Sequence, residues 1–158
     1  MMVLKTPYLK QKTIYSCGPA ALSMHLGYFG ILLTEDELLQ KLQTDPDTGT
    51  KYTKIVETAQ ENGLLTYFTK KGTLEQIEFY IKKNLPVMVD YIEPIDGDGH
   101  YALVIGFDET HIILNDPWYG EKFSMKKERF LNSWNHKDHG QWMMILSKTT
   151  IPEYSAKI

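Results

Sequence analysis

The stretch QKTIYSCGPAAL, residues 11–22, carries the only cysteine of the chain, Cys17, where a turn-like Cys-Gly-Pro segment leads into helix-favouring residues. Pro19 suits the first turn of a helix, because the N–H that proline lacks would have no intrahelical partner there. The stretch therefore predicts a helix over 17–29 with a thiol at its N-terminus. Unpaired N–H groups and the helix dipole favour a thiolate at that position. A lone cysteine is more often a small buried hydrophobic residue, so a reactive role requires partners elsewhere.

The pattern of apolar residues changes character along the chain. Helices are predicted over 34–42, 52–62 and 73–83, the first and last opening with capping boxes (Thr34 with Glu37, Thr73 with Gln76), and a short helix over 126–133. Strands are predicted over 64–69, 87–92, 100–107, 111–115 and 141–147. Helices thus crowd the N-terminal half and strands the C-terminal half. This order predicts an α+β fold, with an N-terminal helical lobe packed on a C-terminal antiparallel sheet.

A predicted hairpin brings a histidine and an aspartate together. Strands 100–107 and 111–115 are joined by a turn at 108–110, so the numbers of paired residues sum to about 217 or 218. The partner of His100 then lies near residue 117 or 118. Asp116 falls within one or two positions of it, close enough for a cross-strand or diagonal contact. A histidine–carboxylate pair of this kind fixes the tautomer and orientation of the imidazole.

These residues suit nucleophilic catalysis. A cysteine nucleophile needs a base, the base needs an orienting acceptor, and the intermediate needs donors for its oxyanion. Cys17, His100 and Asp116 could fill the first three roles. Gln11, six residues before the cysteine, carries a side-chain NH₂ that could donate to the oxyanion together with the Cys17 backbone N–H.

At this point the chain resembles a known family. The motifs are Gln11, Cys17-Gly18-Pro19-Ala20, Gly99-His100-Tyr101 with Val104-x-Gly106, and Asn115-Asp116-Pro117, and they span residues 5 to about 147. In this order they are similar to the papain-like cysteine peptidases of the double-glycine-leader, bacteriocin-processing type. The resemblance implies a papain-like fold, a Cys-His-Asp triad, an oxyanion-hole role for Gln11, a peptide or protein substrate and no cofactor.

The resemblance leaves the substrate open. The best-known members are N-terminal domains of ABC transporters that cut leader peptides after Gly-Gly, whereas this sequence reads as a stand-alone domain, so a transporter partner is unknown. The same architecture also serves acyl transfer and transpeptidation. Some relatives have lost the cysteine and only bind peptide. Cysteine peptidase, acyltransferase and non-catalytic peptide-binding module are therefore three separate hypotheses.

Bulk composition narrows the remaining function classes. The chain has 158 residues, which suits a single domain over 1–158, with 151–158 expected to fray. A net charge of −3 argues against nucleic acid as a partner. No apolar run approaches the roughly 20 residues that span a bilayer, and residues 1–15 have no leader-like apolar segment. We therefore expect a cytoplasmic protein without stable membrane insertion.

Two further clusters contain residue types that bind metals. His136, Asp138 and His139, with His111 elsewhere, lack a defined third ligand at a suitable spacing, so solvated surface is the preferred interpretation. The loop at 96–99, Asp-Gly-Asp-Gly, lacks the full ligand set of a calcium loop. No metal site is therefore predicted. The aromatic residues that fit either a substrate cleft or core packing are Trp118, Tyr119, Trp134 and Trp142.

Overall fold

The computed structural model describes residues 1–93 and 97–156. Its helices are α1 (Cys17–Tyr28), α2 (Glu35–Lys41), α3 (Tyr52–Glu61), α4 (Leu74–Lys82) and α5 (Lys127–Ser133). Its strands are β1 (Met2–Val3), β2 (Leu65–Thr69), β3 (Val87–Ile92), β4 (Gly99–Phe107), β5 (His111–Asp116), β6 (Gly120–Lys126) and β7 (Met143–Ser147). Asp96, at the start of the loop considered for calcium, lies outside the described residues. None of the described helices is both long and apolar enough to cross a membrane.

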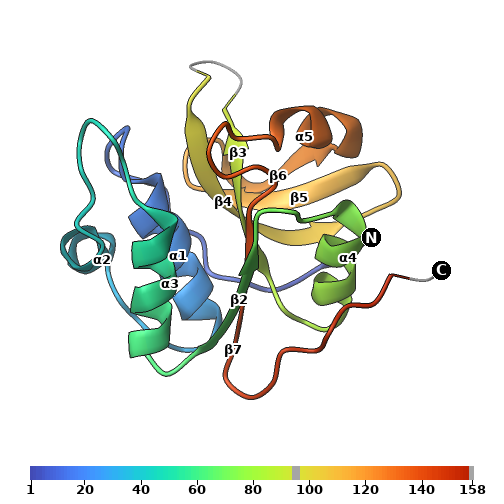
Figure 1. Ribbon diagram of the computed structural model, residues 1–158, viewed down its shortest axis with the longest axis horizontal. Helices are drawn as coiled ribbons and strands as arrows, with labels where there is room; N and C mark the ends of the chain where they lie inside the picture. Colours follow the sequence, from blue (N-terminus) through green and yellow to red (C-terminus); the bar gives the residue numbers. More distant parts are fainter. Residues whose placement is uncertain (94–96, 157–158) are drawn as a thin grey trace.

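One antiparallel sheet organises the molecule. The strand order is β2-β7-β3-β4-β5-β6, and β1 pairs with the end of β4. Helices α1, α2 and α3 lie on one side of this sheet, and α4 and α5 lie on the other (Figure 1). Alternate residues of the buried strand β3 serve the two layers: Met88 packs with the α1–α3 side, and Val87 and Val89 pack with α4 and α5. The α+β fold class predicted from the sequence is confirmed.

The predicted elements are present with small shifts at their ends. Both capping boxes form: Thr34 accepts from the Glu37 amide at 3.1 Å, and Thr73 accepts from the Gln76 amide at 3.1 Å. Strands β1 and β6 were not predicted. β1 has only two residues, and β6 (GEKFSMK) is a polar, mostly exposed strand whose pairing with β5 comes from tertiary context.

Helix α1 is largely buried, and glycine residues allow the close contacts around it and around β4. Most of α1 is shielded from solvent, so it lies inside the molecule. Gly18 allows this approach, because a Cβ there would lie 2.5 Å from the Thr50 hydroxyl. Gly106, at the bulge in β4, allows β1 to pair, because a Cβ there would collide with the carbonyl of Met2. The approach of Gly18 to Thr50 holds the N-terminus of α1 against the loop before α3.

The C-terminal segment 151–156 forms no helix or strand. The Tyr154 ring nevertheless packs edge-on against Phe79 of α4, with ring centroids 5.4 Å apart. This contact covers part of the core between α4 and the sheet.

Candidate active site

Cys17 is the first residue of α1 and is partly exposed. The preceding residue, Ser16, makes no side-chain cap to the helix. Its hydroxyl instead pairs with Thr13, accepting from the Thr13 amide at 3.1 Å and donating to the Thr13 carbonyl at 3.1 Å. This turn before the helix presents the thiol at the helix N-terminus, as the sequence predicted.

His100 and Asp116 form a buried pair. His100 Nε2 lies 2.8 Å from Asp116 Oδ1, and the two residues are 6% and 0% exposed. The β4–β5 register pairs Leu103 with Asn115, a sum of 218, so Asp116 reaches His100 by the diagonal contact expected from the hairpin. On the turn side of the bulge at 104–106 the numbers of paired residues sum to 219, as for Gly106 with Ile113, so the register there is shifted by one residue.

Asp116 is held by several donors besides the imidazole. The amides of Trp118 and Tyr119 each donate to Oδ1 at 2.9 Å, and the Tyr91 hydroxyl donates to Oδ2 at 2.6 Å. Burial raises the pKa of this carboxyl, but bonding to His100 and Tyr91 outweighs it and holds the pKa below its ordinary value. The same negative charge, together with burial, raises the pKa of Tyr91. Asp116 is therefore a fixed carboxylate facing the imidazole.

The other side of His100 faces Cys17. Burial of the ring works to lower its pKa, but hydrogen bonds to Asp116 and to Cys17 outweigh burial and raise it from 6.5 to about 10. Because Nε2 is taken by Asp116, the other ring nitrogen, Nδ1, is the one left for the sulfur. The structure thus brings the three predicted residues into one chain of contacts, from the thiol to the imidazole to the carboxylate.

Gln11 lies beside this chain. Its backbone N–H donates to the Pro117 carbonyl at 2.9 Å, and the next amide, of Lys12, donates to the buried Glu35 carboxylate at 3.1 Å. The side chain is 5% exposed, and its Nε2 donates to the Thr13 carbonyl at 2.7 Å. One N–H of that amide is left for another acceptor. Its Oε1 is buried without a hydrogen-bond partner among the described residues.

Two pockets meet at Cys17. The smaller, of about 80 Å³, is lined by residues that include Gln11, Cys17, His100 and Trp118. The larger, of about 510 Å³, is lined by Cys17, the 46–50 segment, Asp90, Gly99, Tyr101, His136 and His139 among others. Cys17 therefore lies between a narrow pocket that is lined by His100 and Gln11 and a wide pocket that is lined by neither of these two residues.

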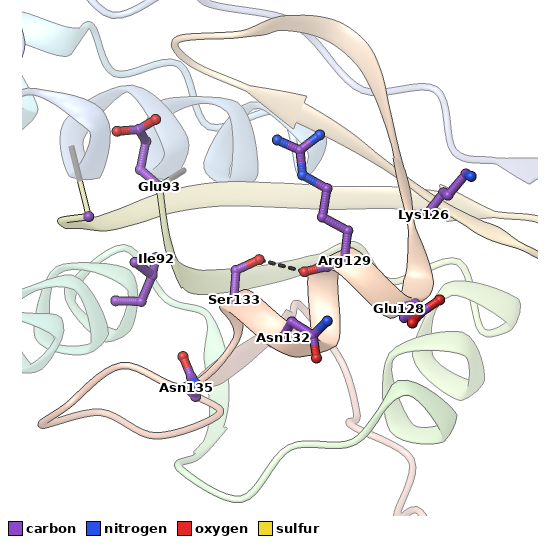
Figure 2. Close-up of a pocket in the computed structure, with 9 residues that line it drawn as sticks. Ile92, Glu93, Lys126, Glu128, Arg129, Asn132, Ser133 and Asn135 are labelled. Carbon is purple, nitrogen blue, oxygen red and sulfur yellow. Dashed lines mark hydrogen bonds between the residues drawn. The ribbon is translucent and has the colours of Figure 1, made fainter. Parts of the chain in front are cut away.

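A third pocket, of about 500 Å³, lies along α5 (Figure 2). Lys126, Glu128 and Arg129 line it, and Ser133 donates to the Arg129 carbonyl at 2.6 Å. None of the four sequence-predicted site residues contributes to it. Glu93 is shared with the smaller pocket at Cys17, so the two hollows are neighbours.

The four aromatic residues left open by the sequence divide between two roles. Trp134 and Trp142 are fully buried in the core. Trp118 is 42% exposed and lines the smaller pocket, and Tyr119 lies edge-on to the His100 ring, with centroids 6.4 Å apart. The two aromatic residues that follow Asp116-Pro117 are thus the ones that border the site.

A second histidine–carboxylate group lies in the larger pocket. His136 and His139 meet Asp90, with candidate ligand atoms of the three within 4.8 Å of one another. His139 Nδ1 lies 2.6 Å from Asp90 Oδ2. The sequence did not indicate this third member of the group, because Asp90 is distant from the two histidines in the chain and lies in the apolar strand VMVDYI. The same strand supplies Tyr91, which was also missed; a polar residue inside an apolar strand was the available signal.

The overall architecture has close counterparts among solved structures. The peptidase domain of Streptococcus ComA, described as a bi-functional ABC transporter involved in quorum sensing, superposes with a TM-score of 0.74 at 25% identity, covering 93% of this chain and 98% of that domain. A putative C39-like peptidase from Bacillus anthracis gives a TM-score of 0.76 at 15% identity, covering 96% and 100%. The chain therefore has the fold of a papain-like C39 peptidase domain.

Sequence comparison places the chain in a family. Residues 3–140 match the Peptidase_C39 like family, and the chain belongs to it. An uncharacterized protein of Methanothermobacter thermautotrophicus is 34% identical over 121 residues, 76% of this chain and 77% of that protein. A second uncharacterized protein, from Methanothermobacter marburgensis, is 32% identical over 113 residues, 71% and 72% of the two chains.

Proposed function

We propose that this protein is a cysteine peptidase that hydrolyses peptide bonds through an acyl-enzyme on Cys17. The observation that carries the proposal is the continuous contact from Cys17 to His100 to the buried carboxylate of Asp116. Family membership supports the same class of enzyme. A double-glycine protease from an AMS/PCAT transporter, solved with its leader peptide, has a similar fold, with a TM-score of 0.69 at 19% identity over 92% of this chain and 93% of that one.

The proposed reaction begins with proton transfer from Cys17 to His100. Asp116 stabilises the resulting imidazolium, and the thiolate attacks the substrate carbonyl carbon. The free N–H of Gln11 and the Cys17 amide donate to the oxyanion of the tetrahedral intermediate. His100 then gives its proton to the leaving amine, and the C–N bond breaks. Water, deprotonated by neutral His100, attacks the thioester, and the acid product and the free thiol are released.

The substrate is proposed to be a peptide or protein, leader peptides included, and the site of action the cytoplasm. Acyl transfer is the competing outcome, because the same thioester yields an amide when an amine replaces water. A peptide-binding module without turnover is the third hypothesis. None of the proposed steps uses a metal or an organic cofactor.

The test is covalent capture and turnover with a peptide library. Wild-type protein is expected to cleave library peptides, and mass spectrometry is expected to find the acyl group on Cys17. Cys17→Ala should lose all turnover with an unchanged circular dichroism spectrum. His100→Ala should lower turnover at least about 10²-fold, whereas the matched control His111→Ala, at the far end of the hairpin, should be neutral. Turnover retained in Cys17→Ala would end the proposal.

The same experiment separates the rival functions. Added amines should not appear in the products if water is the acceptor, and amide products would identify an acyltransferase. Binding of library peptides without any adduct or product would identify a binding module.

A further inference from the structure

The larger pocket at Cys17 lies on the acyl side of the scissile bond. In the proposed mechanism the leaving amine must reach His100 to receive its proton. His100, Gln11 and Trp118 all line the smaller pocket, so the leaving group occupies that side. The larger pocket contains Cys17 but neither His100 nor Gln11, and it therefore receives the part of the substrate that stays bonded to the sulfur.

This acyl-side pocket is too large for a substrate of glycine residues. Glycine has no side chain and requires no hollow beside the backbone, whereas this one measures about 510 Å³. A pocket of that size accommodates a long side chain. The charge of the pocket indicates which kind of long side chain it fits.

The charge of the pocket is negative. Asp47, Asp90 and Asp98 line it, and no lysine or arginine is among its lining residues within the part of the chain that the structure describes. The smaller pocket adds Glu93 and again shares Asp98. Carboxylates on several sides of a hollow attract a cationic group and raise its local concentration.

Among these carboxylates, Asp90 is buried and held in place by the protein. It is 2% exposed and, like Met88 two residues earlier, faces the side of the sheet covered by α1, α2 and α3. Its partner across the β3–β4 pair is Tyr101. His139 occupies its Oδ2 at 2.6 Å, but Oδ1 has no hydrogen-bond partner among the described residues. Gly99 leaves open the space beside this oxygen: a Cβ there would lie 3.1 Å from Oδ1 and 2.8 Å from His136 Nε2. A buried carboxylate oxygen without a donor is costly, and a cationic N–H group would satisfy it.

A metal ion fits this cluster less well than an organic cation. The amides of Asp138 and His139 donate to His136 Nδ1, at 3.0 and 3.2 Å. A neutral imidazole that accepts at Nδ1 carries its proton on Nε2, the nitrogen that borders the space beside Gly99. Metal ligation needs a free lone pair, so His136 would first have to break both amide bonds.

We propose that the acyl-side pocket selects a lysine or arginine side chain within two residues of the scissile bond, with the cation held by the Asp90 carboxylate and by Asp47 and Asp98 at the rim. This inference rests on the proposed function, because it assigns the acyl side from the roles of Cys17 and His100. It names a substrate class, basic peptides, that family membership does not supply.

The test uses thiol-directed peptide vinyl sulfones with either lysine or norleucine, its neutral counterpart of similar length, at the first or second residue on the acyl side. Labelling of wild-type Cys17 is followed by intact mass. We expect the lysine probe to react at least about 10-fold faster than the norleucine probe at one of the two positions. The preference should shrink at about 1 M salt, where the screening length is about 3 Å.

Asp90→Asn tests the residue itself, because asparagine keeps an acceptor for His139 while removing the charge. The lysine preference should fall at least about fivefold in this variant. The control Asp108→Asn removes a partly exposed carboxylate from the β4–β5 turn, away from the pocket, and should leave the preference unchanged. Norleucine labelling of Asp108→Asn should match the wild type, and in each protein the ratio of the lysine rate to the norleucine rate cancels any change in thiol reactivity.

A binding measurement separates failure of this inference from failure of the proposed function. Calorimetry on Cys17→Ala with unreactive peptides of the same sequences should show tighter binding of the lysine peptide. Labelling at equal rates by lysine and norleucine at both positions would overturn the inference and leave the peptidase proposal standing. Absence of all labelling would overturn the peptidase proposal, and the calorimetry would then decide the inference. Tight binding of Zn²⁺ that is lost in Asp90→Asn would also overturn the inference, in favour of a metal site.

Discussion

Replacing Asp116 by asparagine isolates the electrostatic contribution of the buried carboxylate. The change preserves size and leaves an oxygen for the amides of Trp118 and Tyr119, but it removes the negative charge facing His100. The structure raises the pKa of His100 from 6.5 to about 10 against the effect of burial, and bonding to Asp116 comes first among the effects that raise it. A rise of that size corresponds to about 5 kcal/mol in favour of the imidazolium.

Without the charge, burial dominates and Cys17 alone supports the imidazolium. We expect the pKa of His100 to fall by about four, from about 10 to about 6, in Asp116→Asn, so that the imidazolium, almost complete in the wild type at pH 7, remains in only about a tenth of the variant molecules. The thiolate partnered by this imidazolium becomes rarer. Alkylation of Cys17 by iodoacetamide near neutral pH should therefore slow at least about tenfold.

The assay is an NMR titration of the His100 imidazole, run beside alkylation rates across the same pH range. Tyr91→Phe is the matched control, because it removes one hydrogen bond to Asp116 but keeps the carboxylate, and it should change the pKa of His100 far less. If Asp116→Asn titrated and alkylated like the wild type, the electrostatic account of the site would be wrong.

Stability should follow pH with a definite sign. The folded-state pKa of His100 lies above the unfolded value, so its contribution to the free energy of unfolding is fully present below pH 6.5 and is lost as pH rises through about 10. Urea denaturation should show a difference between wild type and Asp116→Asn that is largest at the acid end of this window and shrinks toward pH 10. A difference independent of pH would assign Asp116 a purely structural role.

Two further changes test other parts of the structure. Gln11→Ala should lower turnover about 10²-fold to 10³-fold while leaving the alkylation rate of Cys17 unchanged, because an oxyanion donor acts after thiolate formation; equal losses in both assays would place Gln11 in thiol activation instead. Thr73→Ala removes the capping box of α4 and should lower the free energy of unfolding, measured by urea denaturation, by about 1 kcal/mol. The control Thr53→Ala, at an exposed position of α3, should change it by no more than about 0.5 kcal/mol. Equal effects of the two changes would argue against a stabilising role of the cap.

Much of the site follows from local signals in the chain. The Cys-Gly-Pro segment sets the thiol at a helix start because turn chemistry and the position of proline are decided by neighbouring residues. The hairpin around 108–110 brings His100 and Asp116 together because a short turn fixes the register of the strands that it joins. The bulge at Gly106, where β1 approaches closely, shifts that register, and no local pattern predicts it.

The contact between the Cys17 thiol and the His100 imidazole does not follow from local signals in the sequence. It depends on how α1 packs against the face of the sheet at the start of β4, and side-chain packing across that interface sets the geometry. The same holds for the Tyr91 hydroxyl that donates to Asp116 and for the contact of Asp90 with His136 and His139, which are far apart in sequence. The sequence by itself therefore determined most of the helices and strands, and it singled out Cys17, His100 and Asp116 as candidates for the chemistry. The tertiary structure decided which residues touch across layers and between distant segments, because these contacts depend on the packing of whole layers and not on the periodicity of any one segment.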